Sequence, residues 1–136
     1  MDFTLPNYIY KVKEVVRVVD GDTVYIICDL GMHITVYKKI RMLDIDTDEM
    51  RGGTVDTKLR ANLAKDRLID LLASGDVYIQ TKMDSTGKYG RLLGNFYVVQ
   101  DDTVIDVKAT LIEEGYEKGG TGTSFTERLK SFFLGK

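Results

Sequence analysis

Hydrophobic and polar residues alternate along much of this chain, a pattern typical of β-strands that bury one face. Valine, isoleucine and tyrosine dominate these stretches, and glycine or aspartate separates them. The pattern predicts strands over residues 11–19, 23–30, 34–43, 76–83, 91–99 and 103–107. Turn signals at Asp20-Gly21-Asp22 and at Gly31 join the first three strands, which we expect to form an antiparallel meander.

Between residues 56 and 74 the apolar spacing changes to three and four, which predicts an amphipathic helix. Its expected buried face comprises Ala61, Ala64, Leu68, Leu71 and Leu72. Asp56 or Thr57 is expected to cap its start and Gly75 to end it. Shorter helices are predicted over 108–114, closed by Gly115, and over 125–133, after a capping-box sequence.

A strand meander, a helix, further strands and terminal helices together favour the α+β class. The specific expectation is a five-stranded OB-fold Greek-key barrel with about three helices. No linker or internal repeat divides the chain, so residues 1–136 are expected to form a single domain.

Composition narrows the possible chemistry. Cys28 and His33 are the only residues of their kinds, which excludes an internal disulfide, a histidine–cysteine metal site and a histidine-based triad. The net charge of −2 argues against broad nonspecific adhesion to nucleic acid, although a local basic cleft remains compatible with it. No membrane span or signal peptide is visible, so we expect no membrane partner and favour a cytoplasmic location.

Carboxylates and arginines occur together in three motifs. The first is the Asp20–Thr23 turn, the second runs from Arg41 to Glu49, and the third is Lys88-Tyr89-Gly90-Arg91. Aspartates at the first two sites can hold a hard cation, another carboxylate can activate water, and guanidinium groups can grip a phosphate. Each motif alone also fits a plainer structure: a hairpin turn, a basic strand face or a solvated acidic loop. The ordered set favours a metal-assisted phosphodiesterase, and oxygen ligands alone would allow calcium or magnesium.

These three motifs, in this order from about residue 12 to 116, resemble the staphylococcal nuclease (thermonuclease) family. The resemblance implies a calcium-dependent nuclease that hydrolyses DNA and RNA with low sequence specificity and leaves 3′-phosphate ends. It implies Asp22, Asp46 and the Thr47 carbonyl as calcium ligands, and Glu49 as general base. It further implies a phosphate-binding and catalytic pair, Arg41 and Arg91, and two substrate-binding residues, Lys88 and Tyr89. We expect a monomer that acts on DNA or RNA.

The chain departs from the family pattern in four places. Asp48 replaces a common proline, Gly87 replaces a loop aspartate, residues 119–123 replace base-packing tyrosines, and the balance of charge is acidic. The main alternative is therefore a noncatalytic OB-fold module that binds single-stranded nucleic acid. A protein-interaction domain that retains only the fold is the third possibility.

Overall fold

The strands and helices follow from the alternation and the helical spacing of the sequence. The computed structural model describes residues 8–48, 53–83 and 92–117. The elements in chain order are β1 (Ile9–Asp20), β2 (Thr23–Asp29), β3 (Thr35–Met42), α1 (Val55–Leu72), β4 (Asp76–Met83), β5 (Leu92–Gln100), β6 (Thr103–Asp106) and α2 (Val107–Glu113). Each predicted element within these residues is present, with ends that differ by one or two positions.

The sheet closes into a barrel. Its strand order is β3-β2-β1-β4-β5-β6, and a parallel pairing of β3 with β5 joins the two sides into five closed strands. Strand β1 carries three register shifts against β2, and such irregularities bend a strand. The bend lets the start of β1 pair with β4 while its remainder pairs with β2. The predicted OB-fold barrel is confirmed, with β6 added as a hairpin on β5.

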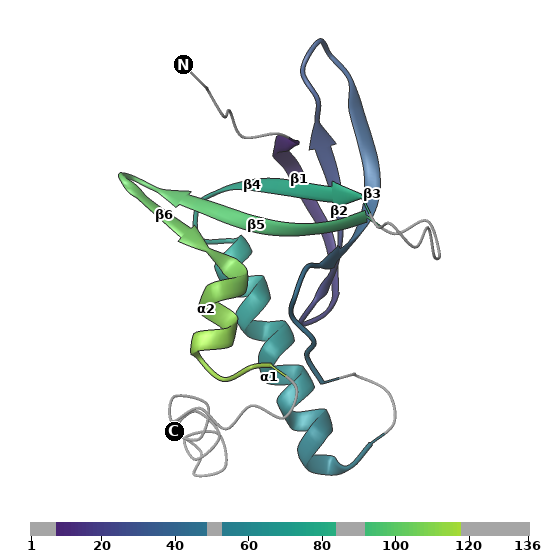
Figure 1. The fold of residues 1–136 in the computed structure, drawn as a ribbon, viewed down its shortest axis with the longest axis vertical. Coiled ribbons are helices and arrows are strands. Elements are labelled where there is room, and N and C mark those ends of the chain that lie inside the picture. Colours follow the sequence, from purple (N-terminus) through teal and green to yellow (C-terminus); the bar gives the residue numbers. More distant parts are fainter. Residues whose placement is uncertain (1–7, 49–52, 84–91, 118–136) are drawn as a thin grey trace, which may run out of the picture.

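Helix α1 lies beneath the barrel with α2 beside it (Figure 1). Its buried residues are the five expected from the sequence: Ala61, Ala64, Leu68, Leu71 and Leu72. They join a core that is filled mainly by large apolar side chains of the strands, among them Phe96, Ile26, Ile40, Met42 and Ile79. Cys28 is also buried in this core.

The expected caps of α1 were wrong. Thr54, rather than Asp56 or Thr57, is the N-cap, and its hydroxyl accepts a hydrogen bond from the Thr57 backbone at 3.2 Å. The helix ends at Leu72 with Ala73 as C-cap, before Gly75 is reached. Gly115 has a φ of +83° and ends α2, as the sequence predicted. The helix expected over 125–133 lies outside the described residues.

Candidate active site

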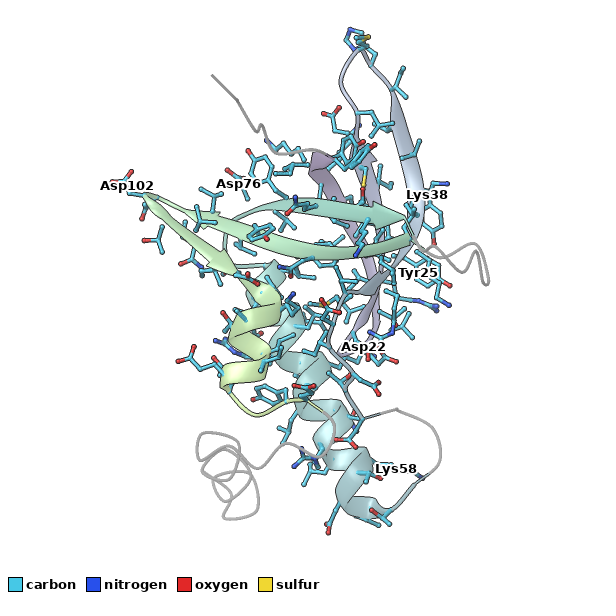
Figure 2. The ribbon with its side chains drawn as sticks, viewed as in Figure 1. Asp22, Tyr25, Lys38, Lys58, Asp76 and Asp102 are labelled. Carbon is cyan, nitrogen blue, oxygen red and sulfur yellow. The ribbon has the colours of Figure 1, made fainter. Side chains whose placement is uncertain are left out.

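The turn between β1 and β2 and the loop after β3 meet at one end of the barrel. Strand pairing places Thr23 opposite Arg41, and the Met42 backbone N–H donates to the carbonyl of Asp22 at 2.7 Å. This pairing brings two motifs that are twenty residues apart in sequence to the same place. Asp22 lies beside α1 at the lower end of the β2 ribbon (Figure 2).

Gly21 allows the turn to approach the rest of the site closely. A Cβ atom at this position would lie 2.7 Å from Thr47 Oγ1 and 2.8 Å from Ala64 Cβ, closer than packed atoms approach. The turn is therefore pressed between the loop after β3 and the middle of α1. Only glycine fits there, and this close packing fixes the position of the neighbouring Asp22.

Asp22 is a buried carboxylate with several partners. Its Oδ2 accepts from the Thr47 backbone at 3.0 Å, and its Oδ1 accepts from the Thr23 hydroxyl at 3.0 Å. Burial alone would raise the pKa of Asp22. Hydrogen bonds from Asp20, Thr47 and Thr23 and the nearby Arg41 guanidinium outweigh burial, so the pKa is lowered and the carboxylate stays ionised.

Arg41 connects the two aspartates. Its Nη2 lies 3.4 Å from Asp22 Oδ2 and 3.4 Å from Asp46 Oδ1, so both carboxylates converge on one guanidinium. Its Nη1 donates to the carbonyls of Met42 at 2.8 Å and Ile45 at 2.6 Å. The same side chain thereby closes the tight turn after β3, where Asp44 has a left-handed φ of +58°.

Asp20 is a fourth member of the site that the sequence analysis did not single out. Its Oδ1 accepts from the Asp22 backbone N–H at 3.1 Å, as in a short aspartate turn. Burial, together with the hydrogen bond and charge of Asp22, raises its pKa to about 6. The sequence did contain a signal for Asp20 as a site residue. Asp20 and Asp22 flank one glycine in a tight turn, and such aspartates must lie close together.

The oxygen atoms of this site suit a hard cation. The carboxylates of Asp22 and Asp46 both lie beside Arg41 Nη2, and Thr47, which directly follows Asp46, donates its backbone N–H to Asp22 Oδ2. Calcium accepts carboxylate, carbonyl and water oxygens and needs no nitrogen or sulfur ligand. Within residues 8–48, 53–83 and 92–117 no group of three or more histidine, cysteine or acidic side chains is close enough to hold a metal.

Asp48, which stands where the family commonly has proline, forms an ion pair with α1. Its Oδ2 accepts from Arg60 Nε of α1 at 2.9 Å, and it is 5% exposed. The Arg60 guanidinium thereby compensates the negative charge of Asp48. The remaining predicted site residues, Glu49, Lys88, Tyr89 and Arg91, lie outside the described residues.

Comparison with known protein families indicates a nuclease-type or nucleic-acid-binding OB-fold domain. The family model "Staphylococcal nuclease homologue" matches residues 39–124, more than half of the chain, and the chain therefore belongs to this family. The match includes Arg41, Asp46 and Thr47 and begins after Asp22.

A comparison with curated proteins gives no match. In the described part of the chain, no helix has the length and apolar character needed to cross a membrane.

Proposed function

We propose that this protein is a calcium-dependent nuclease that cleaves DNA and RNA with low sequence specificity and leaves 3′-phosphate ends. The carrying observation is the convergence of Asp22 and Asp46 on Arg41 in a member of the staphylococcal nuclease family. Asp22 comes from a separate part of the sequence, and the pairing of β2 with β3 brings it to Arg41.

In this proposal Asp22, Asp46 and the Thr47 carbonyl hold the calcium ion. When bound, calcium supplies positive charge beside the phosphate and a site for water. The lowered pKa of Asp22 keeps that carboxylate ionised for this task at neutral pH. The Thr47 backbone N–H, donating to Asp22 Oδ2, fixes the orientation of the carboxylate.

Arg41 has two roles in the proposal. Without substrate it neutralises the aspartates, and with substrate its planar fork binds phosphate oxygens. Arg91 would bind the same phosphate, while Lys88 and Tyr89 would hold the neighbouring part of the nucleotide. Positive groups placed in advance offset the negative charge that grows on phosphate oxygens during attack.

Glu49 would accept the proton of the attacking water. The water oxygen then bonds to phosphorus, the bond to the 5′-oxygen breaks, and the phosphate remains on the 3′ side. Glu49 immediately follows Asp48, so the Asp48–Arg60 ion pair anchors the chain directly before the general base. We propose that the active species is a monomer, because the sequence of a single chain contains all these residues.

The test is cleavage of single-stranded DNA and RNA in calcium, in magnesium and in chelator. Arg41→Ala, Glu49→Gln and Asp46→Asn should each abolish or greatly reduce calcium-dependent cleavage. Asp44→Asn is the matched control, because Asp44 is an exposed acid of the same loop for which the structure shows no contact with Arg41 or Asp22. Sensitivity of the product ends to a phosphatase specific for 3′-phosphate would identify the leaving atom.

Two results would contradict the proposal. Full activity of Glu49→Gln would remove its assigned role, and cleavage that persists in chelator would remove the metal. Salt-dependent binding of single strands without cleavage in any metal would instead identify the noncatalytic module.

A further inference from the structure

The outward face of β2 and β3 carries an aromatic pair beside the candidate site. The Tyr25 and Tyr37 rings are stacked, with centroids 5.7 Å apart and planes inclined by 23°. They are diagonal neighbours, because Tyr25 pairs with Lys39 and Tyr37 pairs with Ile27. Tyr25 is half-buried behind its neighbour, whereas Tyr37 is 58% exposed. Tyr25 thus packs against Tyr37, and the exposed ring of Tyr37 is available to a partner.

Two cations surround this pair. The Arg17 guanidinium lies 5.0 Å from the centroid of the Tyr25 ring, and Lys39 Nζ lies 5.7 Å from it. Arg17 comes from β1 and Lys39 from β3, and strand pairing places them on either side of Tyr25. Both are exposed. Arg17, Tyr25, Tyr37 and Lys39 together are called the tyrosine surface below.

The tyrosine surface is continuous with the candidate active site. Residues 37, 39 and 41 alternate along β3, so their side chains leave the same side of the strand. Tyr37 therefore lies about 13 Å from Arg41 along the strand, from a rise of about 3.3 Å per residue. Figure 2 shows Tyr25 beyond Asp22 along the same ribbon, with Lys38 farther on.

We propose that the tyrosine surface binds the single-stranded nucleic acid to one side of the cleaved phosphate. This proposal rests on the proposed function, which makes Arg41 a phosphate ligand. Tyr37 would stack with a base, since every base offers a flat π-face to an aromatic ring. Lys39 and Arg17 would pair with backbone phosphates and contribute binding that weakens with salt.

The charges favour this occupant and its path. The whole chain has a net charge of −2, yet the two charged side chains that lie over the Tyr25 ring, Arg17 and Lys39, are both cationic. Glu14 of β1 pairs with Ile27 of β2. We therefore expect the nucleic acid to run over β2 and β3, away from the Glu14 carboxylate. Single-stranded nucleic acid, with negatively charged phosphates and flat bases, matches this arrangement better than an uncharged partner does.

A purely structural role makes a different prediction. Cross-strand aromatic and cation–π contacts stabilise a sheet without any ligand. In that case Tyr37→Ala would lower the melting temperature and leave the affinity for nucleic acid unchanged. Binding and stability must therefore be measured on the same variants.

The experiment measures fluorescence anisotropy of labelled single-stranded DNA with the full chain in chelator, so that no cleavage occurs. Strands of about 12 and about 3 nucleotides are compared, because an OB fold covers about 4–16 nucleotides. Tyr37→Ala should weaken binding of the longer strand about tenfold, from the loss of one stacked base. Tyr37→Trp should restore it.

Lysine variants on one strand provide a matched pair. Lys39→Ala should weaken binding and reduce the slope of log affinity against log salt by about 1. Lys38→Ala should alter neither, because Lys38 pairs with the buried Ile26 and leaves the other side of β3. Tyr8→Ala removes a similarly exposed tyrosine, 64% accessible, directly before β1 and controls for general aromatic loss.

The outcomes separate this surface from the nuclease. Tyr37- and Lys39-dependent binding without cleavage in calcium would support the surface and overturn the catalytic proposal. In another outcome, the wild-type chain cleaves nucleic acid while its Tyr37→Ala and Lys39→Ala variants bind the longer strand as tightly as wild type. That result would overturn the proposal for the tyrosine surface alone. Absence of wild-type binding in chelator would also overturn it. If Tyr37→Ala fails to fold, the Lys39 and Lys38 salt slopes decide.

Discussion

Asp48 and Arg60 form an ion pair, with Oδ2 and Nε 2.9 Å apart and side chains only 7% and 18% exposed. Arg60 Nη2 also donates to the Glu117 carbonyl at 3.3 Å, and Glu117 forms a β-bridge with Thr47. One arginine of α1 thereby ties the loop after β3 to the segment after α2. The loop that carries Thr47 is held by charge at the position where the family commonly has proline.

Breaking this ion pair should cost stability. Asp48→Asn removes the charge attraction between two largely buried side chains, and we expect a loss of about 3 kcal/mol in the free energy of unfolding. Urea unfolding monitored by circular dichroism measures the change. Asp44→Asn, an exposed acid in the same loop, should change the midpoint little. Equal midpoints for Asp48→Asn and wild type would show that the pair contributes nothing.

Gly21→Ala should damage both stability and the site. The new Cβ would lie 2.7 Å from Thr47 Oγ1 and 2.8 Å from Thr47 Cγ2, so the turn or the loop must move. Overpacking of this kind costs about 1–3 kcal/mol. Thermal unfolding and calcium-dependent cleavage should fall together. Gly31→Asn is a suitable control, because no atom lies within 4 Å of a Cβ there and asparagine tolerates the φ of +79°. Wild-type stability of Gly21→Ala would contradict the close packing.

The fold was predictable because its signals are local. The buried face of α1 follows from apolar spacing, since residues three and four apart share one side of a helix. Alternation gave the strands in the same way. The exact cap of α1 was not predictable, because Thr54, Asp56 and Thr57 all carry suitable oxygen atoms. Tertiary contacts select among them.

The site was predictable only in part, for a physical reason. Asp22, Arg41 and Asp46 were expected at one cleft, and the structure brings them together. Asp48 pairs with a residue twelve positions away on α1, so its partner depends on how the helix docks against the barrel. The raised pKa of Asp20 comes first from burial, which single-sequence patterns do not reveal.

The stability of the metal-free protein should depend on pH through Asp20. Its pKa rises from 3.8 to about 6 on folding, so the folded state binds this proton more tightly. The resulting stabilisation is complete below 3.8 and is lost as pH rises through about 6. Asp20→Asn does not titrate, so its melting temperature relative to wild type should increase across that interval.

Melting curves in chelator at several pH values test this. Asp22→Asn should show the opposite trend, because the lowered pKa of Asp22 gives stability above 3.8 that disappears at lower pH. A difference between Asp20→Asn and wild type that does not vary with pH would contradict the assignment of the raised pKa to Asp20.

Arg41 should oppose calcium binding while promoting cleavage. Its Nη2 lies 3.4 Å from a carboxylate oxygen of both proposed metal ligands, so a cation must compete with the guanidinium for them. Arg41→Ala should therefore bind calcium at least as tightly as wild type in the absence of nucleic acid. Its turnover should nevertheless fall by about 10²-fold or more, because positive charge at the phosphate is lost.

Calorimetric titration with calcium, alongside cleavage rates, separates these two effects. Asp46→Asn should lose calcium affinity and cleavage activity together. Arg41→Lys retains the charge without the planar fork, so its turnover should lie between those of wild type and Arg41→Ala. An Arg41→Ala protein that loses calcium affinity as completely as Asp46→Asn would show that the guanidinium organises the carboxylates for the metal. Competition would then be the wrong description of the contact between Arg41 and its two aspartates.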